Sequence, residues 1–139
     1  MHKAQNVVGR LVEVRVASPL ALEEVQQLVG ELQGIIKRLA RNYVGVVDLL
    51  QAEVFPVPVA ETLIKLLSGV APQLDRTAFL IRDSAVFALQ VERVIRNSNH
   101  PGRRVFREPE ALQEWLGEVL DVQEQARLAQ FVDDAIGRR

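Results

Sequence analysis

Two aspartates stand where the catalytic groups of an α/β protein would be expected. Asp48 lies near the end of an apolar segment over 43–49, and Asp83 follows a second one over 77–81. If these segments are neighbouring parallel strands, both carboxylates fall at the same edge of the sheet. Such a pair could hold Mg²⁺, or divide the roles of general acid and base in the hydrolysis of a phosphoester or a related substrate. The alternative is structural: Asp48 accepts hydrogen bonds from loop amides, and Asp83 shapes the turn before Ser84.

Other residue types that support catalysis or cofactor binding are scarce. The chain has no cysteine, which excludes disulfides, thiolate metal ligands and cysteine nucleophiles. His2 and His100 lie in a terminal segment and a turn, without the spacing of a metal motif. Gly30 and Gly34 fall within an expected helix, so no glycine-rich phosphate loop follows a strand. We therefore expect no catalytic residue and no cofactor, with the two aspartates as the only metal candidates.

Positive charge concentrates between residues 93 and 107, where no carboxylate interrupts the sequence. This segment holds Arg93, Arg96, Arg103, Arg104 and Arg107, together with His100. It could receive a phosphate, an acidic partner or RNA. Alternatively, the first two arginines offset a helix dipole, and the others stand on the exposed face of an edge strand. The segment lacks a series of aromatic stacking platforms between its arginines, so we expect no nucleic-acid partner.

The elements that must position these residues alternate between strand and helix periods. The pattern predicts a single α/β domain with a small mixed, mostly parallel sheet and flanking helices, in the order β-α-β-α-β-α-β-α-α. The expected strands cover 11–16 as a half-buried edge strand, 43–49 as a central strand, 77–81 and 104–106. The expected helices run from Ser18-Pro19 to about Arg41, from near Pro58 to Pro72, from the cap Ser84, from Pro109, and from a capping box of Asp121 and Glu124.

Composition limits the class of protein. A chain of 139 residues with 48% hydrophobic content can form one domain with a substantial core. Its net charge of -1 does not favour nucleic acid or anionic lipid as a partner. No apolar run approaches the roughly 20 residues of a membrane span, and the first residues lack the pattern of a signal peptide. We expect a soluble, cytoplasmic protein.

The junction that follows the central strand contains no reactive side chain. Residues 55–59 read Phe-Pro-Val-Pro-Val, which is apolar and stiffened by proline. Ligands of parallel α/β folds collect at such junctions, so this one is suited to contact rather than catalysis. The residues that we expect to carry an interaction are Phe55, Pro56, Val57, Pro58, Ser84, Phe87, Arg93, Arg96, Arg103 and Arg104.

Two segments carry a resemblance to a known family. Residues 46–49 read Val-Val-Asp-Leu, and residues 104–116 read Arg-Val-Phe-Arg-Glu-Pro-Glu-Ala-Leu-Gln-Glu-Trp-Leu. With the element order over about 11–120, they resemble the STAS-like fold of bacterial anti-sigma-factor antagonists, in its sporulation-antagonist-like branch. In signalling members, a partner kinase phosphorylates a serine in the turn after the central strand, and the unphosphorylated form binds the partner. The matching positions here, Pro56 to Val59, hold no hydroxyl, so the resemblance implies a docking surface without the phosphorylation switch.

These observations lead to one expected function and two alternatives. We expect a non-catalytic interaction or regulatory module of bacterial signalling that binds a protein partner. The alternatives are an apolar or lipid-like ligand, since this branch is similar in topology to lipid carriers, and a Mg²⁺-dependent hydrolytic enzyme using the strand-end aspartates. Residues 1–120 would form the STAS-like domain. Residues 121–139 would form a helical extension, apolar as far as Ile136, packed on the same domain or on a partner, which leaves a homodimer open.

Overall fold

The chain folds around a five-stranded sheet whose strands lie side by side in sequence order. The computed structural model describes residues 1–98 and 100–137. The strands are β1 (His2–Gln5), β2 (Leu11–Val16), β3 (Tyr43–Leu49), β4 (Leu74–Ile81) and β5 (Arg103–Phe106). The helices are α1 (Leu22–Lys37), α2 (Val57–Val70), α3 (Ala85–Asn97), α4 (Pro109–Gly117) and α5 (Val122–Gly137), and a 3₁₀ turn over Ala71–Gln73 joins α2 to β4.

Strands β2 to β5 are parallel, and only β1 runs antiparallel, against β2. The prediction of a small, mostly parallel sheet with flanking helices is therefore confirmed. Strand β1 was not predicted, because its sequence His-Lys-Ala-Gln has no alternation of apolar and polar residues. Its presence moves β2 from the edge of the sheet to the interior.

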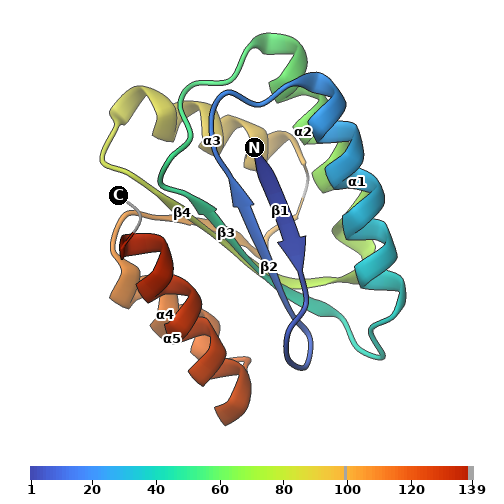
Figure 1. Cartoon of the computed structure of the whole chain (residues 1–139), viewed down its shortest axis with the longest axis vertical. Coiled ribbons are helices and arrows are strands. Elements are labelled where there is room, and N and C mark those ends of the chain that lie inside the picture. Colours follow the sequence, from blue (N-terminus) through green and yellow to red (C-terminus); the bar gives the residue numbers. More distant parts are fainter. Residues whose placement is uncertain (99, 138–139) are drawn as a thin grey trace.

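Helices cover both faces of the sheet in two layers. Helices α1, α2 and α3 pack on one face, and α4 and α5 pack together on the other (Figure 1). The central strand β3 contributes to both layers: Tyr43 and Leu49 belong to the first core, and Val44 and Val46 to the second. Burial on both faces explains why β3 is apolar almost throughout, as predicted.

Strand β2 shows why the prediction of a half-buried edge strand is wrong. All six of its residues are buried. Its valines face α1 to α3, while Glu13 and Arg15 lie beneath α5. Arg127 binds Glu13 at 2.7 Å, and Asp134 binds Arg15 at 2.8 Å. The polar face that looks solvent-exposed in the sequence is covered by a helix that supplies a charged partner for each residue.

Two predicted helix starts had different outcomes. The prediction that Ser18 caps the first helix is wrong, because α1 begins at Leu22 after Ala21 and ends at Lys37. The Ser18 hydroxyl instead accepts a hydrogen bond from the Glu53 amide at 2.8 Å. The cap at Ser84 is confirmed: its Oγ accepts a hydrogen bond from the Phe87 amide at 3.3 Å.

The last helix is fixed at its start by the predicted capping box. The Glu124 amide donates to Asp121 Oδ1 at 2.8 Å, and the Asp121 amide donates to Glu124 Oε1 at 2.9 Å. The second oxygen of Glu124 accepts from the Arg10 amide at 2.8 Å, which joins α5 to the turn before β2. Gly9 in that turn has φ 53°, and an added Cβ would lie 2.1 Å from this carboxylate.

Helix α5 packs its apolar side chains on its own sheet. Leu128, Phe131 and Val132 are buried in the second core together with Leu112 of α4. Ile136, at the end of the apolar stripe, remains exposed. The segment from 122 to 137 therefore completes the second layer of the domain.

Candidate interaction surface

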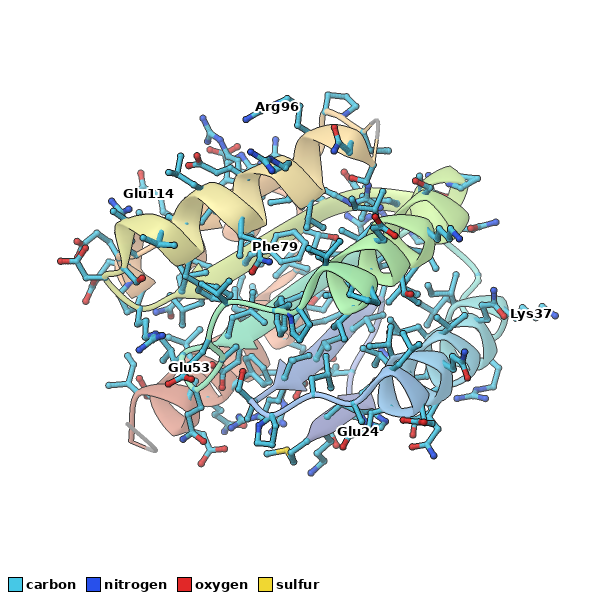
Figure 2. All side chains as sticks on the ribbon, turned by 90° about the horizontal axis from the view of Figure 1, so that it is seen from above. Glu24, Lys37, Glu53, Phe79, Arg96 and Glu114 are labelled. Atoms are coloured by element: carbon cyan, nitrogen blue, oxygen red, sulfur yellow. The ribbon has the colours of Figure 1, made fainter. Side chains whose placement is uncertain are left out.

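The loop over 50–56 between β3 and α2 lies at the carboxyl edge of the parallel strands. Asp48, at the end of β3, accepts a hydrogen bond from the Leu50 amide at 3.0 Å. Ser18 holds the Glu53 amide, and Figure 2 shows the Glu53 side chain directed outward from this loop. The loop is thus fixed at its start and at its middle by side chains of the sheet and of the segment before α1.

Gln90 of α3 anchors the end of the same loop. Its side-chain oxygen accepts from the Phe55 amide, and its side-chain nitrogen donates to the Phe55 carbonyl, each at 2.8 Å. The Phe55 and Phe87 rings meet edge to face with their centroids 5.7 Å apart. One amide side chain therefore satisfies both backbone groups of Phe55 and ties the β3–α2 loop to α3. A loop fixed before binding loses little conformational entropy when a partner docks.

Exposed hydrophobic side chains lie on both segments that this anchor joins. Val54 and Val57 lie on either side of Phe55-Pro56, and Val86 and Leu89 lie in the first turns of α3. Their exposed fractions run from 51% to 68%. Val86 is four residues before Gln90 and three before Leu89, so its side chain neighbours both on α3, and the Gln90 contact brings this part of the helix to the loop. We call these four residues the carboxyl-edge surface.

The expected interaction residues of this region differ in accessibility. Phe55 and Phe87 are buried and support the surface from within. Pro56, Val57 and Pro58 are exposed, and Ser84 is half-buried as the cap of α3. The sequence reasoning missed Val54, Val86 and Leu89. The available signal was that Val86 and Leu89, three residues apart, fall outside the stripe of Phe87, Val91 and Val94 that packs on the sheet.

The arginines of the 93–107 segment do not form one patch. Arg93 and Arg96 are exposed on α3, and Figure 2 shows Arg96 projecting away from the helix. Arg107 is 3.7 Å from Asp83. Arg104 lies on the sheet face that α4 covers, 5.4 Å from the centroid of a tryptophan ring on that helix. The segment is divided by the alternation of side chains along β5.

Arg103 is buried, so the expectation that it stands on the exposed face of an edge strand is wrong. Its guanidinium donates to the Ser98 hydroxyl at 2.7 Å and to the Leu67 carbonyl. Burial lowers the pKa of Arg103, and the neighbouring Tyr43 partly offsets this effect. Burial likewise raises the pKa of the Tyr43 hydroxyl. Arg103 acts inside the domain, as a link between β5, α3 and α2.

The two aspartates are held by different partners. Asp48 is buried, binds the Leu50 amide and lies 3.8 Å from Arg15 beneath α5. Asp83 is exposed and paired with Arg107. The structural role expected for Asp48 at a loop amide is confirmed. Within residues 1–98 and 100–137, no group of three or more histidine and carboxylate side chains is placed to hold a metal ion.

An apolar cavity lies between the sheet and helices α1, α2 and α3. Its volume is about 80 Å³, and its walls are hydrophobic side chains together with Gln90. Phe79, which Figure 2 shows between the sheet and the helices above it, lines the cavity, and so does Phe55. An engineered cavity of about 150 Å³ binds benzene. The present cavity can therefore accept only a small apolar group unless the helices separate.

The architecture places the chain in a known structural class, the SpoIIAA-like α/β fold. A solved structure of an uncharacterized protein from the DUF3478 family, from Shewanella loihica PV-4 and described as having a SpoIIAA-like fold, is similar to this chain with a TM-score of 0.64. The two share 14% sequence identity, and the match covers 83% of this chain and 93% of that one. The expected STAS-like fold is thereby confirmed at the level of structure. The sequence matches no family model and no curated protein.

In the part of the chain that the structure describes, no helix is both long enough and apolar enough to cross a bilayer.

Proposed function

We propose that this chain is a non-catalytic interaction module of bacterial signalling or regulation that binds a protein partner through the carboxyl-edge surface. The observation that carries the proposal is the exposure of Val54, Val57, Val86 and Leu89 on a loop and a helix joined by Gln90. Exposed apolar side chains grouped on a fixed scaffold are typical of sites that bind another protein. The SpoIIAA-like fold supports a role in protein interaction.

The same site lacks the chemistry of a phosphorylation switch. Helix α2 begins with Val57-Pro58-Val59, and the first hydroxyl in it, Thr62, donates to the Pro58 carbonyl at 2.9 Å. A phosphate at a helix start is stabilised by free backbone amides and by the helix dipole. The first residues of α2, Val57-Pro58-Val59, carry no hydroxyl that could be phosphorylated. We therefore propose that docking is constitutive at this edge.

The test is affinity capture from the source cell with charge-insertion variants. Val57→Glu and Leu89→Glu each place a carboxylate within the surface, so we expect both to lose the partner that the unaltered chain retains. Val122→Glu is the matched control, because Val122 is 81% exposed at the start of α5 on the other layer. Exposed substitutions of this kind change stability by about 0.5 kcal/mol or less, and circular dichroism confirms the fold of each variant.

Retention of the same partner by Val57→Glu and Leu89→Glu would show that docking occurs elsewhere. Loss of the partner by Val122→Glu as well would point to a non-specific effect of charge. Light scattering at micromolar concentrations adds a separate result: a dimeric mass that becomes monomeric in Val57→Glu would identify a second copy of the chain as the partner.

A second candidate function is the binding of an apolar ligand, which the cavity favours. The ligand would have to be small, or would have to displace α2 and α3 from the sheet, because the cavity holds about 80 Å³. Native mass spectrometry of protein purified without detergent tests this candidate. A co-purified lipid mass that is lost in Val47→Leu, which adds a methylene group to the cavity wall, would support it.

A further inference from the structure

An open groove lies at the amino edge of the sheet, opposite the carboxyl-edge surface. It has a volume of about 450 Å³ and is bounded by the starts of β4 and β5, the loop before β5, and α4. The lining residues are Asp75, Arg76, His100, Pro101, Gly102 and Arg104, with Trp115 from α4. The proposed protein-binding function does not use any of these residues.

Trp115 positions two guanidinium groups in this groove. The Arg76 guanidinium is 4.9 Å and the Arg104 guanidinium 5.4 Å from the centroid of its ring. The register pairs Arg104 with Ala78, so Arg76 and Arg104 project from β4 and β5 toward the same helix. Contact with an indole ring orients an arginine while leaving its N–H donors free. Both cations are therefore held against the same ring before any ligand arrives.

The charges in the groove are only partly balanced. Asp75 is paired with Arg10 at 2.6 Å. Arg76 uses Nη1 for both of its bonds, to the Trp115 carbonyl at 2.7 Å and to Glu118 at 2.8 Å, which leaves Nη2 and Nε for a ligand. Among residues 1–98 and 100–137, the Arg104 side chain has no ion pair and no hydrogen bond, and only its contact with the Trp115 ring is present. Its whole set of five N–H donors is available.

Residues 100–102, just before β5, form one wall of the groove. The Gly102 amide donates to His100 Nδ1 at 2.8 Å. A Cβ added at Gly102 would lie 2.4 Å from the Asp75 carbonyl, so this loop packs directly against the start of β4. Burial, and then the charge of Arg103, lower the pKa of His100. The imidazole is therefore neutral near pH 7, and the positive charge offered to a ligand comes from the arginines.

We propose that this groove binds the phosphate group of a phosphate-bearing small molecule between Arg104 and Arg76. Guanidinium groups bind phosphate oxygens in a fork, and a phosphate monoester carries enough oxygens and charge to engage two of them. A carboxylate has two oxygens and a single charge, which one guanidinium already satisfies. The open form of the groove leaves room for the remainder of the molecule.

The chain contains a single tryptophan, so tryptophan fluorescence reports on this groove alone. We would titrate the protein with inorganic phosphate, phosphoserine and acetate, holding ionic strength constant with sodium chloride. We expect a saturable change with both phosphate compounds. Arg104→Gln should weaken binding by about tenfold or more, since a hydrogen bond to a charged group contributes on that scale. Arg93→Gln, an exposed arginine on α3, is the matched control and should bind as the unaltered chain does.

Three results would overturn the proposal. They are the absence of a saturable response to either phosphate compound, an unchanged affinity in Arg104→Gln, and a response to acetate as strong as the response to phosphate. Arg104→Lys keeps the charge on the edge strand but loses the planar fork, so we expect intermediate affinity. This variant maintains the test if Arg104→Gln does not fold, which circular dichroism would reveal.

Discussion

The pairing of Glu13 with Arg127 joins α5 to the sheet, and its loss should be costly in a predictable way. Arg127 donates from Nε and Nη2 to the two oxygens of Glu13, at 2.7 Å and 2.8 Å. The Glu13 side chain is 1% exposed, whereas that of Arg127 is 27% exposed. In Arg127→Met, the carboxylate stays buried, and the side-chain amide of Gln5, at 3.0 Å, is its one remaining side-chain donor among the residues that the structure describes.

The difference in exposure between the two side chains decides how much unfolding free energy each substitution should remove. Removing one partner of a buried ion pair costs about 3–5 kcal/mol, and partial access of water around Arg127 places Arg127→Met near the lower limit, at about 3 kcal/mol. In Glu13→Leu, the arginine can turn to solvent, so we expect a loss of about 1 kcal/mol. The double variant removes both charges, and we expect it to lose about 1 kcal/mol as well. The coupling energy would then be about 3 kcal/mol.

Urea denaturation of the four proteins in this double-mutant cycle measures the free energy of unfolding directly. The reasoning would be refuted if Arg127→Met lowered the free energy of unfolding by less than about 1 kcal/mol, because a buried carboxylate without its ion-pair partner should destabilise the fold by more than this. It would equally be refuted if the loss of unfolding free energy in the double variant equalled the sum of the losses in the two single variants. Additive losses would mean that Glu13 and Arg127 do not stabilise each other.

Two further predictions concern single positions. Gly9→Ala should lower the free energy of unfolding by more than about 1 kcal/mol, because φ is 53° and the new Cβ meets Glu124; Gly69→Ala, whose Cβ meets nothing within 4 Å in α2, should not lower it. Burial raises the pKa of Tyr43, so its contribution to stability is full below the unfolded-state pKa of about 10 and is lost as the pH rises through the folded-state value. Tyrosinate absorbance should therefore appear together with alkaline unfolding, and its appearance in folded protein below pH of about 10 would contradict this.

The elements of the fold that could be predicted have strong local signals in the sequence. Strand β3 is apolar except for Asp48, Ser84 precedes an amphipathic helix, and the spacing of Asp121 and Glu124 matches a capping box. Each signal lies within a few residues, and each depends on local hydrogen bonds or on burial from both sides. These elements could be placed without knowing what packs against them.

The parts that were missed depend on contacts distant in sequence. Glu13 looks solvent-exposed until Arg127, 114 residues away, is known to cover it. Ser18 looks like a helix cap, but its hydroxyl binds Glu53 in another loop. Arg103 looks like one of several surface arginines until Ser98 and Leu67 enclose it.

The loop part of the proposed carboxyl-edge surface could be read from the sequence, but its α3 part could not. The junction after β3 could be found because it is apolar and rich in proline. Val86 and Leu89 join it through contacts between α3 and Phe55, the bonds of Gln90 and the ring of Phe87, which no local pattern indicates.

Strand β4 connects the two ends of the molecule at which ligands are proposed to bind. It begins two residues before Arg76 and ends three residues before Ser84. Its eight residues, at about 3.3 Å each, keep the two ends roughly 25 Å apart. Occupants of both ends would not collide, and the buried strand between them is a stiff spacer. If both proposals hold, the phosphate-bearing molecule and the bound protein are kept at a fixed separation.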